Sequence, residues 1–276
     1  MSHHTKHQIL QRTVRFSVNP DGSSIGTNSF AGVPAPIGFA RFYEIRLSIK
    51  GHPDPQTGYL INIHAIDSIV RDHLVPLFTE QISNDPSAHP ATLMPALWTN
   101  ASAQTKHALR SIHWNLTPYE SIEMTNATES SHAVLVRQRF EFAAAHRLHA
   151  PAMSDAENEA YFGKCNNPNG HGHNYQLEPC VRVPIGLLES SSFALKIEHA
   201  VNTVLLEKLD HKFLNTDCPW FDQSAGGVIP SIEHIARVCY EQLAPAISKL
   251  GDGVELVTMT AWETEKTASI YPAAAH

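Results

Sequence analysis

Apolar and polar residues follow the same order of patterns twice along the chain. In the first half, alternating, β-branched and aromatic residues predict strands, and apolar residues three and four positions apart predict helices. The predicted order is strand, strand, helix, helix, strand, strand, at residues 12–18, 39–50, 63–78, 91–109, 112–116 and 121–125. Residues 19–36 are rich in Gly, Ser, Pro and Asn and are predicted to form a loop.

The second half repeats this order. Its strands are predicted at 134–144, 170–183, 254–263 and 267–271, with a loop after the first strand and helices at 193–209 and 231–250. The polar stretch T-N-A-T-E-S-S-H, residues 125–132, is predicted to be a linker between the halves. This grouping of strands and helices indicates an α+β protein, and we expect two domains, residues 1–127 and 133–276.

Composition and charge exclude several classes of protein. Of the 276 residues, 42% are hydrophobic and 17% are charged, as is typical of a globular protein. The net charge of -7, without a basic cluster, argues against nucleic acid as a partner. No apolar run approaches the roughly 18–20 residues that a membrane span needs.

The N-terminus and the cysteines indicate where the protein works. Met1–Leu10 lacks the apolar core of a secretory signal, and we interpret its histidines, His3, His4 and His7, as part of a frayed tail. All four cysteines lie in the second half, and without an export signal we interpret them as reduced thiols. We therefore expect a cytoplasmic protein.

The segment Phe162–Tyr175, F-G-K-C-N-N-P-N-G-H-G-H-N-Y, carries the strongest chemical signal. On a strand, His171 and His173 point to the same face, and the flanking glycines leave room for a ligand near the backbone. With His146, in F-E-F-A-A-A-H-R-L, they are typical zinc ligands. Three histidines and an open fourth position describe a catalytic zinc, whereas Cys165 as a fourth ligand would describe a closed structural site.

Three separated motifs resemble one known family. The A-H-R-L-H segment, the run from Gly163 to Tyr175 and the later L-D-H-K-F-L-N are similar to 6-pyruvoyl-tetrahydropterin synthases and the related 6-carboxy-tetrahydropterin synthases. The resemblance covers most of residues 133–276, and N-N-P-N leans towards the pyruvoyl branch. It implies two tandem tunnelling-fold domains, each an antiparallel sheet with two helices on one face. It also implies a homo-oligomer, here a trimer of tandem chains or its multiple.

The resemblance implies a substrate and residue roles. The substrate would be 7,8-dihydroneopterin triphosphate, from which triphosphate is eliminated while the side-chain diol rearranges. Zn²⁺ would lie on His146, His171 and His173. Cys165 is our candidate base, and Asp210 with His211 would form a second acid/base pair. Glu263 would anchor the pterin ring through paired hydrogen bonds, and Ser231 and Glu233 would make further pterin contacts. A helix-capping role explains Ser231 equally well.

The first half does not repeat the chemical residues. When Gly38 is aligned with Gly170, Phe39 and Arg41 stand where His171 and His173 stand, and the first half holds no cysteine. We expect a degenerate copy that binds no metal and completes the oligomeric barrel. Two other functions stay open: a 6-carboxy-tetrahydropterin synthase of queuosine or deazaguanine synthesis, and a non-catalytic pterin-binding scaffold with a structural zinc.

Overall fold

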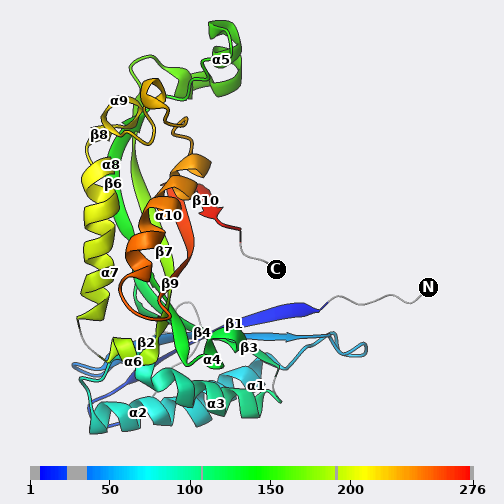
Figure 1. Cartoon of the computed structure of the whole chain (residues 1–276). Helices are drawn as coiled ribbons and strands as arrows, with labels where there is room; N and C mark the ends of the chain where they lie inside the picture. Colours follow the sequence, from blue (N-terminus) through cyan, green and yellow to red (C-terminus); the bar gives the residue numbers. More distant parts are fainter. Residues whose placement is uncertain (1–6, 24–35, 107, 190–191, 274–276) are drawn as a thin grey trace. The chain divides into compact units, whose positions relative to one another are not determined.

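The computed structural model describes residues 7–23, 36–106, 108–189 and 192–273, and the chain divides into two compact units. Residues 1–136 and 183–191 form the N-terminal unit, and residues 137–182 and 192–276 form the C-terminal unit. The divisions fall inside two strands, β5 (Ala133–Gln138) and β7 (His171–Pro184). Figure 1 shows the elements of both units in the order of the chain. The predicted domains, 1–127 and 133–276, stay a prediction.

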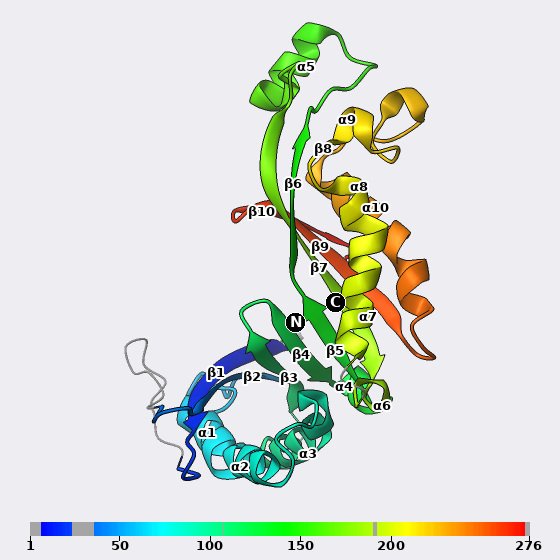
Figure 2. The ribbon, with the colours of Figure 1, turned by 90° about the vertical axis from the view of Figure 1, so that its left-hand side faces the viewer.

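The N-terminal unit is an antiparallel sheet with helices along one face (Figure 2). Neighbouring strands pair in the order β1-β2-β3-β4. The strands are β1 (Gln8–Val18), β2 (Arg41–Gly51), β3 (Leu109–Thr117) and β4 (Glu120–Thr125). The helical segments are α1 (Ile63–Ser68), the π-helical η1 (Ile69–Leu74), α2 (Val75–Asn84), η2 (Pro90–Leu93), α3 (Met94–Gln104), α4 (Asn126–Glu129) and α6 (Ile185–Leu188).

The C-terminal unit has the same kind of layering. Strand β7 pairs antiparallel with β6 (Phe140–His146) and with β9 (Glu255–Thr264), which pairs with β10 (Thr267–Tyr271). The short β8 (Lys212–Phe213) adds to β6 in parallel. Helix α10 (Ile232–Ser248) packs on β9 and β10. The other helical segments are α5 (Asp155–Phe162), η3 (Gly163–Asn166), α7 (Phe193–Val201), the π-helical η4 (Asn202–Leu206), α8 (Glu207–Leu209), α9 (Leu214–Asp217) and η5 (Gln223–Ala225).

Buried apolar faces explain why these segments fold as they do. On the strands, every second residue is buried, as in Tyr43, Ile45 and Leu47 of β2. On α10 the buried residues recur at helical spacing, as in Ile235, Cys239 and Leu243, which places one stripe of the helix on the sheet. Each fully buried large apolar side chain contributes about 1.5–3 kcal/mol to folding. The expected α+β class is confirmed.

Local chemistry corrects several predicted boundaries. The predicted strand 134–144 is two strands broken at Arg139, whose guanidinium binds Glu178 and lies 4.7 Å from the centre of the Trp262 ring. The loop predicted before the motif strand contains α5, which begins at a capping box of Ser154 and Glu157. The predicted linker likewise forms α4, capped by Thr125. His3, His4 and residues 24–35 of the predicted loop lie outside the described residues.

Two prolines stand at helix starts. The helix predicted over 91–109 is shorter, because Pro95 stands in the first turn of α3, which ends at Gln104. Pro76 stands at the start of α2, directly after a π-helical segment, and α2 continues to Asn84, beyond the predicted end at residue 78. None of the helices in the described ranges is both long and apolar enough to cross a membrane.

Candidate metal centre

Three imidazoles meet where β6 ends and β7 begins. The pairing of these strands places His146 opposite His171 and Ala144 opposite His173. Their ring centres lie 4.6 Å apart for His146 and His171, 5.3 Å for His146 and His173, and 4.8 Å for His171 and His173. The i, i+2 spacing therefore brings together the side chains that the sequence singled out.

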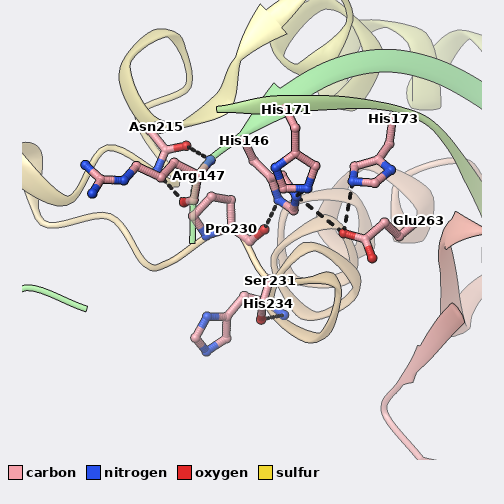
Figure 3. A network of polar contacts seen from close by, with 9 residues as sticks. All are labelled: His146, Arg147, His171, His173, Asn215, Pro230, Ser231, His234 and Glu263. Carbon is pink, nitrogen blue, oxygen red and sulfur yellow. Dashed lines mark hydrogen bonds and ion pairs between the residues drawn. The ribbon is translucent and has the colours of Figure 1, made fainter. Parts of the chain in front are cut away.

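A carboxylate joins the imidazoles, as Figure 3 shows. Oε1 of Glu263, on β9, lies 3.4 Å from Nε2 of His146 and 3.5 Å from Nε2 of His173. Nε2 of His146 lies 3.2 Å from Nε2 of His171. One ligand atom from each of the four residues lies within 4.8 Å of the others. The sequence had assigned Glu263 to the pterin ring, so its place among the imidazoles is new.

These distances fit a zinc ion. Zinc ligands bind at about 2.0–2.2 Å, so the ligand atoms of a tetrahedral site lie about 3.3–3.6 Å apart. Within the described residues, Nε2 of His173 and Nδ1 of His171 are buried and have no hydrogen-bond partner. A buried polar atom without a partner is costly, and a metal on the His173 nitrogen removes that cost at this position.

The backbone fixes the orientation and proton of His146. Its Nδ1–H donates to the carbonyl oxygen of Pro230 at 2.7 Å, which leaves the Nε2 lone pair facing Glu263 and His171. Burial lowers the pKa of His146 to about 4, and burial followed by the charge of His173 lowers the pKa of His171. Both rings are therefore neutral near pH 7, which is the form that binds a metal.

Gly170 has a packing role rather than the predicted one of leaving space for a ligand. Its φ is +70°, and a Cβ there would lie 2.6 Å from the Phe213 ring and 3.0 Å from the His146 carbonyl oxygen. Any other residue would strain the turn into β7 and displace the strand end that carries His146. At Gly172 a Cβ would meet only the Ala144 oxygen, at 3.6 Å.

Cys165 lies near this group without belonging to it. It is a half-buried free thiol in η3, and the group of four potential ligands does not include it. Burial raises the pKa of the Cys165 thiol, and the negative charge of Glu263 raises it further. The thiol is thus protonated at neutral pH in the metal-free protein.

Asp210 and His211 contact each other directly although they are neighbours in sequence. Nδ1 of His211 lies 2.9 Å from Oδ2 of Asp210, and His211 takes a φ of +56°. The Ala143 amide donates to Asp210 Oδ1 at 2.9 Å; this bond, and then the bond to His211, lowers the pKa of Asp210. His211 lines an open hollow of about 580 Å³ together with His173 and Lys212.

The two other predicted contacts lie at the start of α10. Ser231 is the N-cap of this helix, and its hydroxyl accepts a hydrogen bond from the His234 amide at 3.4 Å. Glu233 is exposed in the first turn. Neither residue belongs to the group of potential ligands. The capping role of Ser231, left open by the sequence, is the one that its contacts display (Figure 3).

Sequence reasoning missed three residues that shape the centre. Pro230 supplies the carbonyl that holds His146. Asn215 accepts from the Arg147 amide at 2.8 Å and donates to the Arg147 carbonyl at 2.9 Å, which fixes the chain beside His146 (Figure 3). Tyr175 is fully buried, and its hydroxyl has no partner in the described residues. Asn215 ends the L-D-H-K-F-L-N motif, which was the available signal for it.

Comparisons with known proteins place the chain in a family. A model of the family "6-pyruvoyl tetrahydropterin synthase" matches residues 135–274. A 6-pyruvoyl tetrahydrobiopterin synthase of Drosophila melanogaster is 47% identical over 85 residues, 30% of this chain and 51% of that protein. The chain thus spans about half the length of this relative.

Two further matches cover more of the related protein. The Homo sapiens 6-pyruvoyl tetrahydrobiopterin synthase is 34% identical over 137 residues, 49% of this chain and 89% of that protein. A solved Caenorhabditis elegans 6-pyruvoyl tetrahydropterin synthase is 32% identical, with a TM-score of 0.44 over 51% of this chain and 96% of that one. The family model covers the strands and loops that carry the imidazoles, Cys165, Asp210, His211 and Glu263. The chain therefore belongs to the 6-pyruvoyl tetrahydropterin synthase family.

Proposed function

We propose that the protein is a zinc-dependent lyase that eliminates triphosphate from 7,8-dihydroneopterin triphosphate and yields 6-pyruvoyl-tetrahydropterin. The observation that carries this proposal is the convergence of His146, His171, His173 and Glu263 inside the matched region. The relatives of Drosophila melanogaster and Homo sapiens bear the name of this synthase, which supports the pyruvoyl product.

The three imidazoles would hold the zinc. Bound zinc would supply Lewis acidity, which polarises a substrate oxygen and acidifies the adjacent carbon–hydrogen bond. The neutral state of His146 and His171 supports this role, because protonated imidazole cannot bind a metal.

Cys165 would take a proton from the substrate side chain. In the metal-free protein, burial and Glu263 keep the thiol protonated, so Cys165 becomes a useful base only when a cation balances that charge. The position of Cys165 close to the group, but outside it, supports a role on substrate rather than as a ligand.

His211 would exchange a second proton with the substrate. Its Nδ1 faces Asp210, so the carboxylate would hold the orientation of the ring. The hollow that His211 shares with His173 and Lys212 would receive the substrate side chain, and Lys212 would face its phosphates.

Glu263 would serve the pterin ring and not the metal during turnover. A carboxylate accepts two parallel N–H bonds from a 2-amino-4-oxo ring, and no other acid belongs to the group of potential ligands in the described residues. Its approach to the imidazoles would then be the resting position in the metal-free protein. Ser231 and Glu233, at the start of α10, would contact the pterin only at the outer edge of the site.

Product identification tests the proposed reaction. Zinc-loaded protein is incubated with 7,8-dihydroneopterin triphosphate, and the pterin product and released triphosphate are measured by mass spectrometry. We expect 6-pyruvoyl-tetrahydropterin and one triphosphate per product. The mass of 6-carboxy-tetrahydropterin would assign the protein to deazaguanine or queuosine synthesis instead. Retained zinc without any turnover would support a non-catalytic pterin-binding scaffold.

Removing the thiol separates a catalytic zinc from a structural one. We expect Cys165→Ala to keep one zinc per chain and to lower kcat by about 10²–10⁴-fold, the usual contribution of a positioned acid or base. Cys180→Ala, which alters a buried thiol elsewhere on β7, is the matched control and should keep its turnover. Loss of zinc and of thermal stability in Cys165→Ala would reveal a closed structural site.

We also propose a homotrimer, or a multiple of it, working in the cytoplasm. The thiols of Cys165, Cys218 and Cys239 form no disulfide, which supports a reducing compartment. The family resemblance supports assembly, because its members share active sites between neighbouring subunits. Light scattering that reports a monomer would contradict the trimer.

A further inference from the structure

The N-terminal unit contains a pocket with an aromatic floor. Its volume is about 380 Å³, within the usual range for small-molecule sites. The rings of Tyr43, Phe78 and Trp114 form the floor and are nearly fully buried. The Phe78 ring centre lies 4.8 Å from that of Tyr43 and 4.8 Å from that of Trp114. The rings are packed against one another, so the floor is rigid.

Strand pairing relates this pocket to the metal centre of the other unit. Phe16 faces Tyr43 across β1 and β2, and Phe142 faces Tyr175 across β6 and β7; both pairs are stacked. Tyr43 therefore occupies the position of Tyr175. Counting two residues back along each strand, Arg41 occupies the position of His173.

The next strand pair gives the second correspondence. Glu44 pairs with Asn115 across β2 and β3, and Gln176 pairs with Trp262 across β7 and β9. Leu116 therefore occupies the position of Glu263. Both Arg41 and Leu116 line the pocket. In the N-terminal unit, the pocket thus occupies the position that corresponds to the metal centre of the C-terminal unit. Arg41 replaces His173 there, and Leu116 replaces Glu263.

The replacements invert the hydrogen-bonding character of the site. Arg41 brings a permanent cation and only donors, and Leu116 has no polar atom. His89 also lines the pocket; its Nδ1 accepts from the Ala91 amide at 3.1 Å, so the neutral ring carries its proton on Nε2 as a donor. Asp85 lies at the same pocket, but its Oδ1 already accepts from the amide and hydroxyl of Ser87.

We propose that this pocket binds a small planar aromatic anion, such as an aromatic carboxylate. The Phe78 and Trp114 rings are inclined at 71°, so the ligand ring would stack on one of them and meet the other edge to face. Its carboxylate would accept from the Arg41 guanidinium and the His89 ring.

In the described residues, no carboxylate forms an ion pair with Arg41. Its guanidinium contacts the Tyr43 side chain, and its remaining N–H donors are available to a ligand. Leu116 offers the amino edge of a pterin no acceptor, unlike Glu263 in the other unit.

Calorimetric titration of the full-length, zinc-loaded protein with 2-naphthoate tests this site. We expect saturable binding of one molecule per chain, and binding at least about tenfold weaker for the uncharged 2-naphthamide, because hydrogen bonds to charged groups are the stronger ones. Arg41→Gln should weaken 2-naphthoate about 10- to 100-fold. Arg110→Gln, an exposed change on β3 outside the pocket, is the matched control and should bind as the unchanged protein does.

Two further variants establish where 2-naphthoate binds. His171→Ala removes a proposed metal ligand, so 2-naphthoate binding that persists in this variant does not occur on zinc. Leu116→Glu places an acid in the pocket and should weaken 2-naphthoate at least about tenfold while circular dichroism reports an unchanged fold. Absence of saturable binding at millimolar 2-naphthoate would overturn the proposal. So would equal affinity in Arg41→Gln, or loss of binding in His171→Ala.

Discussion

The two units place different clusters of rings at the same point of their sheets. In the C-terminal unit, His146, His171 and His173 surround a carboxylate, with a stacked Phe142–Tyr175 pair beneath them. In the N-terminal unit the equivalent stacked pair, Phe16–Tyr43, lies against Phe78 and Trp114. A helix in each unit also contains a π-helical segment, Ile69–Leu74 or Asn202–Leu206.

The comparison teaches that the strand framework and the chemistry are separable. The framework depends on buried apolar positions and on strand register, which both units share at the positions compared. The difference lies in a few residues near the strand ends, where one unit presents potential metal ligands and the other presents Arg41 and Leu116. Among the described residues, buried imidazole nitrogens without a hydrogen-bond partner lower the stability of the C-terminal unit. The aromatic floor of the N-terminal unit avoids this cost.

The largest expected effect is on metal content. His171→Ala should reduce zinc from one per chain to well below one, because outer contacts of zinc ligands already change affinity by about 10–100-fold and a direct ligand contributes more. Phe39, the residue of the N-terminal unit that aligns with His171, is fully exposed, and Phe39→Ala should keep one zinc. Elemental analysis of both dialysed variants makes the measurement. Two zinc ions per chain in the protein without substitutions would contradict the expectation that only the C-terminal unit binds metal.

A second effect concerns the pH dependence of the metal-free protein. The pKa of His146 is lowered to about 4 from 6.5, so the unfolded chain binds a proton that the folded protein does not bind between these values. The stabilisation that comes from the lowered pKa of His146 is fully present above about pH 6.5 and is lost as the pH falls towards 4. The loss is of the order of 3 kcal/mol.

Urea unfolding in the presence of EDTA, at pH 7 and at pH 4.5, measures this loss. Other acidic groups also titrate in this range, so the informative quantity is the difference between the unchanged protein and His146→Asn. We expect a clearly smaller pH dependence in the variant. Equal dependence in both proteins would show that His146 is not held neutral by burial.

The smallest expected effect is on substrate recognition. Glu263→Gln should retain zinc and lower kcat/KM roughly 10- to 100-fold, because the amide accepts only one of the two N–H bonds from the pterin and turns a donor towards the other. Leu116→Gln is the register-equivalent change in the N-terminal unit and should leave kcat/KM unchanged. Steady-state kinetics and zinc content are measured on both variants. Zinc loss in Glu263→Gln would instead make the carboxylate a permanent ligand.

The sequence predicted the strands and the histidine group because each depends on local periodicity. The alternation around Tyr43 and Tyr175, and the i, i+2 histidines, carry their structural consequence within a few residues. The helix α5 was missed even though its capping box, Ser154 and Glu157, is visible in the sequence. The segment was predicted to be a loop from its polar composition, and this helix-capping signal was not used.

Contacts between distant segments lay beyond the sequence. The hydrogen bond from His146 to the Pro230 carbonyl joins residues 84 positions apart and uses a backbone atom that any residue would supply. The approach of Glu263 to the imidazoles depends on the register of β9 against β7, which the sequence does not specify. The contact of Arg139 with Glu178 likewise joins residues 39 positions apart.

The backbone amide and carbonyl of Ala143 both form hydrogen bonds to the Asp210–His211 segment. Its amide donates to the Asp210 carboxylate at 2.9 Å, and its carbonyl accepts from the His211 amide at 2.6 Å. Three residues further along the same strand stands His146. Main-chain atoms therefore set the distance between the Asp210–His211 pair and the imidazole group, so this spacing does not depend on the methyl side chain at position 143.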